Sequence, residues 1–173
     1  MEHLKEKIRH VPDFPKPGIL YYDITTLLRD AVGLGEALDG LANPFRDQRI
    51  DLVVGIESRG FILGAAVADR LGTGFVPIRK PGKLPARTVR QSYELEYGSD
   101  TLEMHHDAIE PGQRILIVDD LLATGGTARA AVDLVTGAGG DVASLAFLVE
   151  LQFLNGRARL ADIPMFVALQ YSS

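Results

Sequence analysis

The chain has 173 residues, 46% of them hydrophobic and 24% charged, with a formal net charge of −5. These values are typical of one globular domain with a sizeable core, and the acidic balance argues against a general nucleic-acid binder. The absence of cysteine excludes disulfides and thiolate metal sites and is compatible with a reducing cytoplasm. Because the charged N-terminus lacks an apolar signal-peptide core and no later apolar run could span a bilayer, we expect no membrane partner.

After an N-terminal segment of helix and loop, the hydrophobic pattern alternates between strands and helices. We expect a short charged helix at 4–10, a proline-rich extended loop at 13–18 and a helix at 33–45 that Pro44 weakens near its end. Buried strands are predicted at 52–56, 75–78, 115–118, 142–149 and 165–171, with helices at 61–71 and from 128 onward. The helix at 61–71 is apolar nearly all round, which favours cover on both of its sides. This order predicts an α/β fold with a twisted, mainly parallel sheet flanked by helices.

The pattern fails between residues 81 and 99, where prolines, glycines and charged residues gather. We interpret this stretch as a long exposed loop or ribbon. Loops of this length in compact domains often act as lids over a binding site.

The stretch ILIVDDLLATGGTA, residues 115–128, carries the strongest functional signal. Its apolar start predicts a buried strand, two carboxylates follow at Asp119 and Asp120, and a glycine- and hydroxyl-rich turn then opens a helix. Such a turn lies where open α/β sheets bind ligands, and the backbone N–H groups at the helix N-terminus favour a phosphate. The carboxylates would repel that phosphate but suit a vicinal diol or a bound Mg²⁺, so a ribose 5-phosphate fits both halves. The alternative is an ordinary capped turn beside two solvated aspartates.

Two further strand ends carry groups that suit anions. GIESRG, residues 55–60, has the glycine spacing of a P-loop, but Phe61 stands where the lysine should be, which excludes a Walker motif. Its backbone and the Arg59 guanidinium suit a pyrophosphate, although a capped turn with a solvated arginine fits the spacing equally well. After the next strand, Arg79, Lys80 and Lys83 could neutralise a pyrophosphate leaving group or could form a solvated basic surface.

The run VDDLLATGGTA resembles the phosphoribosyl diphosphate (PRPP) motif of the type I phosphoribosyltransferases. Three further runs resemble the branch of that family that uses adenine: DFPKPGILYYDIT from Asp13, GIESRGFILG from Gly55, and RKPGKLP with YELEYG between Arg79 and Gly98. The resemblance spans residues 11–154. It implies the type I phosphoribosyltransferase fold as one domain over 1–173, with a small hood from about 11–27 and 151–173 and a mobile lid loop at about 81–99.

The resemblance also implies a reaction and its partners. The chain would transfer the 5-phosphoribosyl group from PRPP to adenine, giving AMP and pyrophosphate in purine salvage. Mg²⁺ would be the cofactor, held mainly through PRPP and water, with no metal site built from protein ligands alone. Family members are usually homodimers, with the SRGF and KPGK regions near the partner, and we expect a cytoplasmic enzyme that binds neither nucleic acid nor membrane.

Carried over position by position, the resemblance implies three groups of site residues. Glu96 and Tyr97 in YELEYG would be catalytic, because a carboxylate there could manage the proton that adenine loses when its N9 attacks C1′. The adenine site would comprise Tyr21 stacking on the base, the backbone of Leu20 and Tyr22, and Leu151 as the opposite apolar wall. PRPP would be bound by Ser58, Arg59, Arg79, Lys83, Asp119, Asp120, Ala123, Thr124, Gly125, Gly126 and Thr127. Tyr22 departs from the basic residue common in the family, and a cis peptide bond is implied between Glu57 and Ser58.

Two other functions remain open from the sequence. One is the same fold acting on hypoxanthine, guanine, xanthine or orotate, which the match of the hood segment and of LEYG disfavours. The other is a non-enzymatic regulator that senses PRPP, which the acidic charge and the Glu96–Tyr97 pair disfavour.

Overall fold

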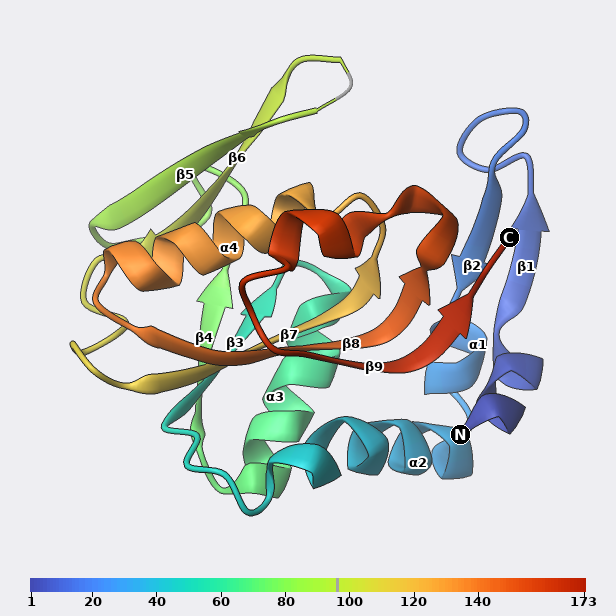
Figure 1. Cartoon of the computed structure of the whole chain (residues 1–173), viewed down its shortest axis with the longest axis horizontal. Coiled ribbons are helices and arrows are strands. Elements are labelled where there is room, and N and C mark those ends of the chain that lie inside the picture. Colours follow the sequence, from blue (N-terminus) through green and yellow to red (C-terminus); the bar gives the residue numbers. More distant parts are fainter. Residues whose placement is uncertain (96) are drawn as a thin grey trace.

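A five-stranded parallel sheet forms the centre of the molecule (Figure 1). The computed structural model describes residues 1–95 and 97–173. In the order β4-β3-β7-β8-β9, the strands are Gly74–Ile78, Leu52–Ile56, Arg114–Leu122, Asp141–Leu151 and Met165–Tyr171. The central strands are continuous apolar runs because both faces of a parallel sheet are covered by helices. The predicted α/β fold with a parallel sheet is therefore confirmed.

Helices cover the two faces of the sheet unequally. Helices α2, Ala31–Ala42, and α3, Arg59–Leu71, lie against one face, and α4, Gly126–Gly137, lies against the other (Figure 1). Alternate residues of β7 serve the two sides: Leu116 packs with the α2–α3 core, whereas Ile117 packs with the α4 core. The short helix α1, Thr25–Leu28, and 3₁₀ turns at Asn43–Phe45, Gln152–Leu154 and Gly156–Leu160 complete the layers.

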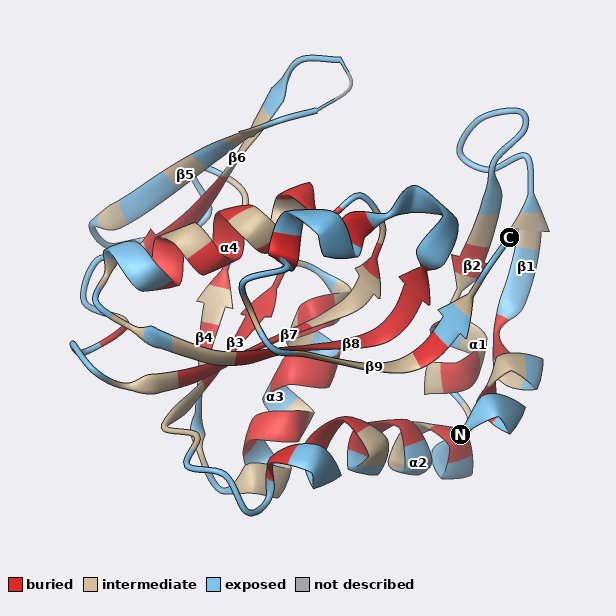
Figure 2. Cartoon of the chain, in the orientation of Figure 1, coloured by how far each residue is buried: buried red, intermediate tan, exposed pale blue. Residues whose placement is uncertain are grey.

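Helix α3 differs from the sequence expectation on its outer side. Figure 2 shows a buried stripe toward the sheet and exposed residues away from it. The side chain of Ile62 is 51% exposed, so the expectation of cover on both sides is wrong for the single chain. The reason is that the sheet and α2 reach only one side of this helix.

The N-terminal segment also differs from its prediction. The expected helix at 4–10 is a 3₁₀ helix, Glu2–Lys7, followed by strand β1, Arg9–Pro12, which pairs antiparallel with β2, Leu20–Asp23. Pairing with a partner farther along the chain overrides the weak local helix preference. The resulting hairpin stands beside the C-terminal end of the chain (Figure 1). Of the C-terminal part of the expected hood, 165–171 runs as β9 in the main sheet.

The segment interpreted as an exposed loop or ribbon at 81–99 contains both: a loop up to residue 87, then strand β5, Thr88–Glu94, and the turn that leads into β6, Ser99–His105. The two strands pair antiparallel, and this ribbon projects beyond the sheet (Figure 1). Its base is part of the core, because Leu102 and Met104 are fully buried with the α4 cluster. Only the tip and the segment before β5 are loops.

Of the helices in the described part of the chain, none combines the length and the apolar character needed to cross a bilayer.

Candidate active site

A cleft opens where β3 and β7 lie side by side and their following connections diverge. Strand β3 neighbours β4 on one side and β7 on the other, so the chain changes direction across the sheet between these two strands. Open α/β sheets bind ligands at such switch points, at the carboxyl ends of the strands. A cavity of about 250 Å³ lies there. The sequence-predicted residues that line it are Ser58, Arg59, Asp119, Asp120, Ala123, Thr124, Gly125, Gly126 and Thr127.

The wall formed by residues 123–127 is the N-terminus of α4. Helical hydrogen bonding begins when Arg129 N–H donates to the carbonyl of Gly125 at 2.9 Å. The N–H groups at the start of a helix have no intrahelical acceptor, and they point along the positive end of the helix dipole. This wall can therefore bind a phosphate group without a cationic side chain.

The same cavity is lined by the paired aspartates near the carboxyl end of β7. The Asp119 carboxylate accepts the Asp120 backbone N–H at 2.9 Å, and Asp120 Oδ2 accepts Arg59 Nε at 2.7 Å. A Cβ on Gly60 would lie 2.7 Å from Asp119 Oδ1, so only glycine lets α3 begin this close to the aspartate. Burial and the neighbouring charge of Asp120 raise the pKa of Asp119 well above the usual range for aspartate. The pair offers several hydrogen-bond acceptors in one place, as recognition of a diol or a hydrated cation requires.

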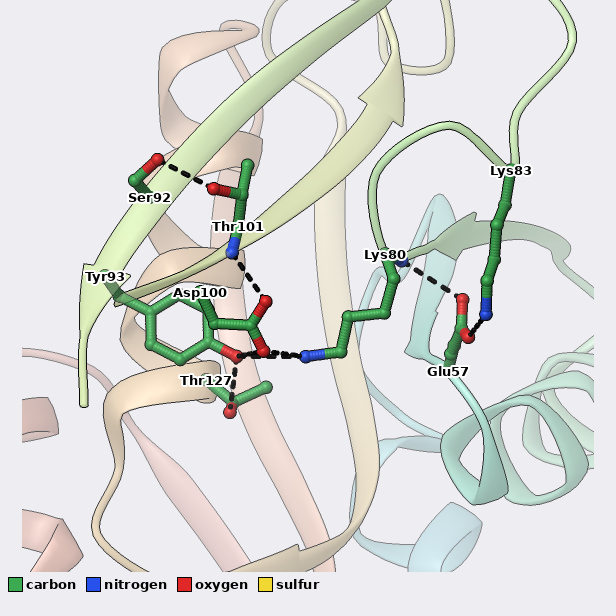
Figure 3. Close-up of polar contacts among 8 residues, drawn as sticks. All are labelled: Glu57, Lys80, Lys83, Ser92, Tyr93, Asp100, Thr101 and Thr127. Carbon is green, nitrogen blue, oxygen red and sulfur yellow. Dashed lines mark hydrogen bonds and ion pairs between the residues drawn. The ribbon is translucent and has the colours of Figure 1, made fainter. Parts of the chain in front are cut away.

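The Glu57–Ser58 peptide bond at the start of this turn is cis, as the resemblance implied. The Glu57 carboxylate is nearly buried and binds donor groups of the basic segment after β4 (Figure 3). It accepts the Lys80 backbone N–H at 3.1 Å and Arg79 Nε at 3.2 Å, and it forms an ion pair with Lys83. Burial favours the neutral form of Glu57, but these donors outweigh it and lower its pKa. Arg79 and Lys83 are thus held at Glu57 and do not line the cavity.

The cation that lines the cavity from this segment is Lys80. The sequence pattern indicates a basic cluster that includes Lys80 but no individual role for this lysine. Nor does any sequence motif indicate a role for Glu57, Tyr93 or Asp100, which bind the basic segment in the structure. The position of Lys80 directly after β4 was the only available signal, because its contacts to β5 and β6 depend on pairing between distant segments.

The residues expected at the adenine site fall on two faces of β2. Leu20, Tyr22 and Leu151 line a largely apolar cavity of about 380 Å³. Tyr21 points to the other face, where its ring contacts Phe14 with centroids 5.1 Å apart. The guanidinium carbon of Arg59 lies 6.0 Å from the centroid of the same ring. Tyr21 is therefore the residue of this set that adjoins the cleft.

The side chain of Tyr22 packs inside the molecule and contacts the C-terminal end of the chain. It is 8% exposed, its ring packs against Tyr171 with centroids 4.2 Å apart, and its hydroxyl donates to the carbonyl of Ser173 at 2.8 Å. These contacts tie the hairpin to the C-terminal end of the chain. Most of the Tyr22 side chain is therefore occupied by contacts within the chain, although the residue still lines the apolar cavity.

Of the two residues expected to be catalytic, the structure describes only Tyr97, which follows β5 at the tip of the ribbon. Tyr97 is 84% exposed there and does not line the cavity. Glu96 lies outside the described residues. Within those residues, no three acidic or histidine side chains converge to hold a metal ion.

Comparisons with known proteins agree with the geometry of the cleft. The phosphoribosyl transferase domain family matches residues 34–163. The adenine phosphoribosyltransferase of Acidobacterium capsulatum is 64% identical over 171 residues, covering 99% of this chain and 94% of that protein. The adenine phosphoribosyltransferase of Solibacter usitatus is 61% identical and covers 99% of both chains.

Solved structures give the same result. Adenine phosphoribosyltransferase from Thermoanaerobacter pseudethanolicus has a TM-score of 0.96 at 50% identity, covering 98% of this chain and 99% of that chain. The Saccharomyces cerevisiae protein, complexed with adenine and an imino-altritol bisphosphate, has a TM-score of 0.91 at 42% identity, covering 96% and 97%. The fold, the cleft and these matches define a phosphoribosyltransferase. The chain belongs to the adenine phosphoribosyltransferase family.

The close approach of Gly156 to the α4 loop generates a prediction. A Cβ at residue 156 would lie 2.4 Å from the carbonyl oxygen of Ala123 and 3.1 Å from the amide nitrogen of Gly125. Gly156→Ala must therefore displace the loop backbone. We expect the free energy of unfolding to fall by about 1–3 kcal/mol, as in other overpacked sites, and PRPP binding to weaken.

Gly137→Ala is the matched control, because a Cβ there meets nothing within 4 Å and the residue lies at the other end of α4. Urea unfolding and calorimetric titration with PRPP would measure both variants. If Gly156→Ala kept the stability and the PRPP affinity of the wild type, Gly156 would have no role in shaping the loop.

Proposed function

We propose that the chain transfers the 5-phosphoribosyl group from PRPP to adenine, releasing AMP and pyrophosphate, as an enzyme of purine salvage. The observation that carries this proposal is the cleft between β3 and β7, which is lined by a phosphate-binding helix N-terminus and by two acceptor carboxylates. A ribose 5-phosphate needs both kinds of group. Relatives that are named for this activity span nearly the whole chain, and the yeast relative was solved with adenine bound.

Different residues of the cleft bind different parts of PRPP. Residues 123–127 bind the 5′-phosphate, and Asp119 and Asp120 accept hydrogen bonds from the ribose hydroxyls. Ser58 and Arg59 contact the diphosphate. Arg79 and Lys83 also bind it, after they release the Glu57 carboxylate with which they pair in the structure. Neutralising the diphosphate stabilises the charge that it gains as the C1′–O bond breaks, while the carboxylates stabilise positive charge on the ribose.

Mg²⁺ would be held in this site mainly through PRPP and water. The donor chemistry fits, because Asp119 and Asp120 offer oxygen ligands of the kind Mg²⁺ prefers, and PRPP and water supply the others. When bound, the ion neutralises part of the diphosphate charge. Asp119 and Asp120 would then contact both the ribose hydroxyls and the hydration shell of the ion.

Adenine is read by the free edge of β2. Within the described residues β2 pairs only with β1, so its other edge leaves backbone N–H and C=O groups unpaired. Leu20 and Tyr22 supply these groups, Tyr21 stacks on the base beside Arg59, and Leu151 forms the apolar wall. Because N9 must lose its proton as it attacks C1′, Glu96 takes that proton and Tyr97 closes over the site.

Adenine turnover tests the proposed function. Adenine N1 accepts and N6 donates a hydrogen bond, whereas hypoxanthine reverses this polarity, and a backbone pair cannot rotate to follow the reversal. We expect kcat/KM for adenine to exceed that for hypoxanthine by about 10⁴–10⁵, measured as nucleotide formation with PRPP and Mg²⁺. Similar values for the two bases would contradict adenine as the substrate.

The double variant Asp119→Asn, Asp120→Asn is the control for the PRPP site. PRPP with Mg²⁺ at a hundredfold excess over its Kd should stabilise the wild type by roughly 2.7 kcal/mol, and the variant should lose most of this shift. A full shift in the variant would remove both aspartates from the site.

The proposed role of Glu96 generates a separate prediction. Glu96→Gln keeps the size of the side chain but removes a base, so we expect the single-turnover rate to fall by about 10²–10⁴-fold with PRPP affinity unchanged. Single-turnover measurement avoids a limit set by lid opening. Glu94→Gln, an exposed neighbour on β5, is the control and should keep the wild-type rate.

We also propose that two copies of the chain associate. We place the protein in the cytoplasm, with which its lack of cysteine is compatible. The exposed Ile62 on the outer face of α3 supports association, because it directly follows the SRGF region that we expect near the partner. Ile62→Glu should shift the sedimentation mass from two chains to one. A wild type that sediments as one chain would contradict the proposal.

A further inference from the structure

A chain of polar contacts links the β5–β6 ribbon to the cleft, and the proposed roles above do not account for it (Figure 3). Lys80 Nζ forms an ion pair with Asp100 and lies 3.4 Å from the Tyr93 hydroxyl. That hydroxyl donates to Asp100 Oδ2 at 3.3 Å and accepts Thr127 Oγ1 at 3.3 Å. One hydroxyl thus joins the ribbon, the lysine after β4 and the phosphate-binding wall.

The ribbon register brings these groups together. Tyr93 on β5 and Asp100 on β6 are direct cross-strand partners, so their side chains lie on the same face of the ribbon. The segment after β4 is fixed to the same ribbon, because Arg79 and Glu103 exchange backbone hydrogen bonds of 2.9 and 2.7 Å. The ribbon therefore holds both the backbone next to Lys80 and the carboxylate that binds its side chain.

The Asp100 carboxylate is itself oriented. Its Oδ1 accepts the Thr101 backbone N–H at 2.8 Å, which leaves Oδ2 for Lys80 and Tyr93. Burial lowers the pKa of Lys80, but the hydrogen bond from Lys80 to Asp100 and the contact with Tyr93 outweigh it and raise that pKa. The lysine stays protonated at the cavity it lines.

The contacts orient Lys80 without using all of its donors. A lysine ammonium has three N–H donors, and Asp100 and Tyr93 take two of them. Among the described residues no other acceptor takes the third donor, which can serve an anion in the cavity. A lysine side chain without a partner would lose considerable rotamer entropy when it placed that donor at a ligand. The ion pair with Asp100 orders Lys80 before the ligand binds, so binding itself does not incur this loss.

We propose that Asp100, supported by Tyr93, is a positioning residue that holds the Lys80 ammonium at the cleft and couples the ribbon to binding of the PRPP anion. The inference rests on the proposed function for the identity of the anion. The Asp100 carboxylate does not contact the reacting atoms. Its effect passes through Lys80.

A double-mutant cycle tests this proposal on the full chain. Asp100→Asn should raise the Kd for PRPP with Mg²⁺ by about tenfold, and KM for adenine should not change. In a Lys80→Met background, Asp100→Asn should have no further effect. Asp100→Glu should restore part of the affinity, and Tyr93→Phe should weaken binding by about threefold.

Glu94→Gln is the matched control, because it removes one carboxylate from the same ribbon at an exposed position, and it should leave the Kd unchanged. Thermal unfolding checks that each variant is folded. Three results would overturn the proposal: an unchanged Kd for Asp100→Asn, an equal loss in the Lys80→Met background, or tighter binding, which would make Asp100 a competitor of the ligand.

The same measurements separate this proposal from the proposed function. A wild type that forms no AMP from PRPP and adenine refutes the function, and the cycle is then carried out with inorganic pyrophosphate as the probe. A wild type that is active while Asp100→Asn binds PRPP normally refutes only the positioning role.

Discussion

The parallel pairing of β3 with β7 is the constraint on which the site depends. The register runs from Leu52 opposite Ile115 to Gly55 opposite Val118, so the turn after β3 lies beside Asp119 and Asp120 of β7. The next connections leave in opposite directions across the sheet, one to β4 and the other to β8. Between them the backbone cannot fill the space at the sheet edge, and a cleft remains. A shift of this register would separate Arg59 from Asp120, and the residues of the two turns would no longer line one cleft.

Charge balance is the second organising feature of the site. The cations around the cleft are paired with carboxylates: Arg59 with Asp120, Lys83 with Glu57, and Lys80 with Asp100. A chain of net charge −5 can therefore hold an anion site without leaving a strongly basic surface. Binding of an anion then exchanges one set of charge contacts for another. Such an exchange favours ligands that match the full set of donors over simple anions.

Recognition of the base and of the phosphates is carried by different parts of the chain. The match to the general phosphoribosyl transferase family spans residues 34–163, which include the α4 wall and both aspartates. The β1–β2 hairpin lies outside that match and holds three of the four residues expected to meet adenine. This division agrees with a shared scaffold for phosphoribosyl transfer to which a separate segment adds the choice of base.

The sequence by itself determined the elements whose signal is local. The strands at 52–56 and 165–171 agree with β3 and β9 at both ends, and the glycine-rich turn before α4 lies where the motif placed it. Apolar runs and helix-opening turns are set by neighbouring residues. Only the tertiary structure decided that 9–12 is a strand, that Leu102 and Met104 bury the base of the β5–β6 ribbon in the core, and that Tyr21 and Tyr22 serve opposite faces. It also decided that Lys80 lines the cleft while Lys83 pairs with Glu57, because these outcomes depend on contacts between residues about 13 to 34 positions apart that no local pattern encodes.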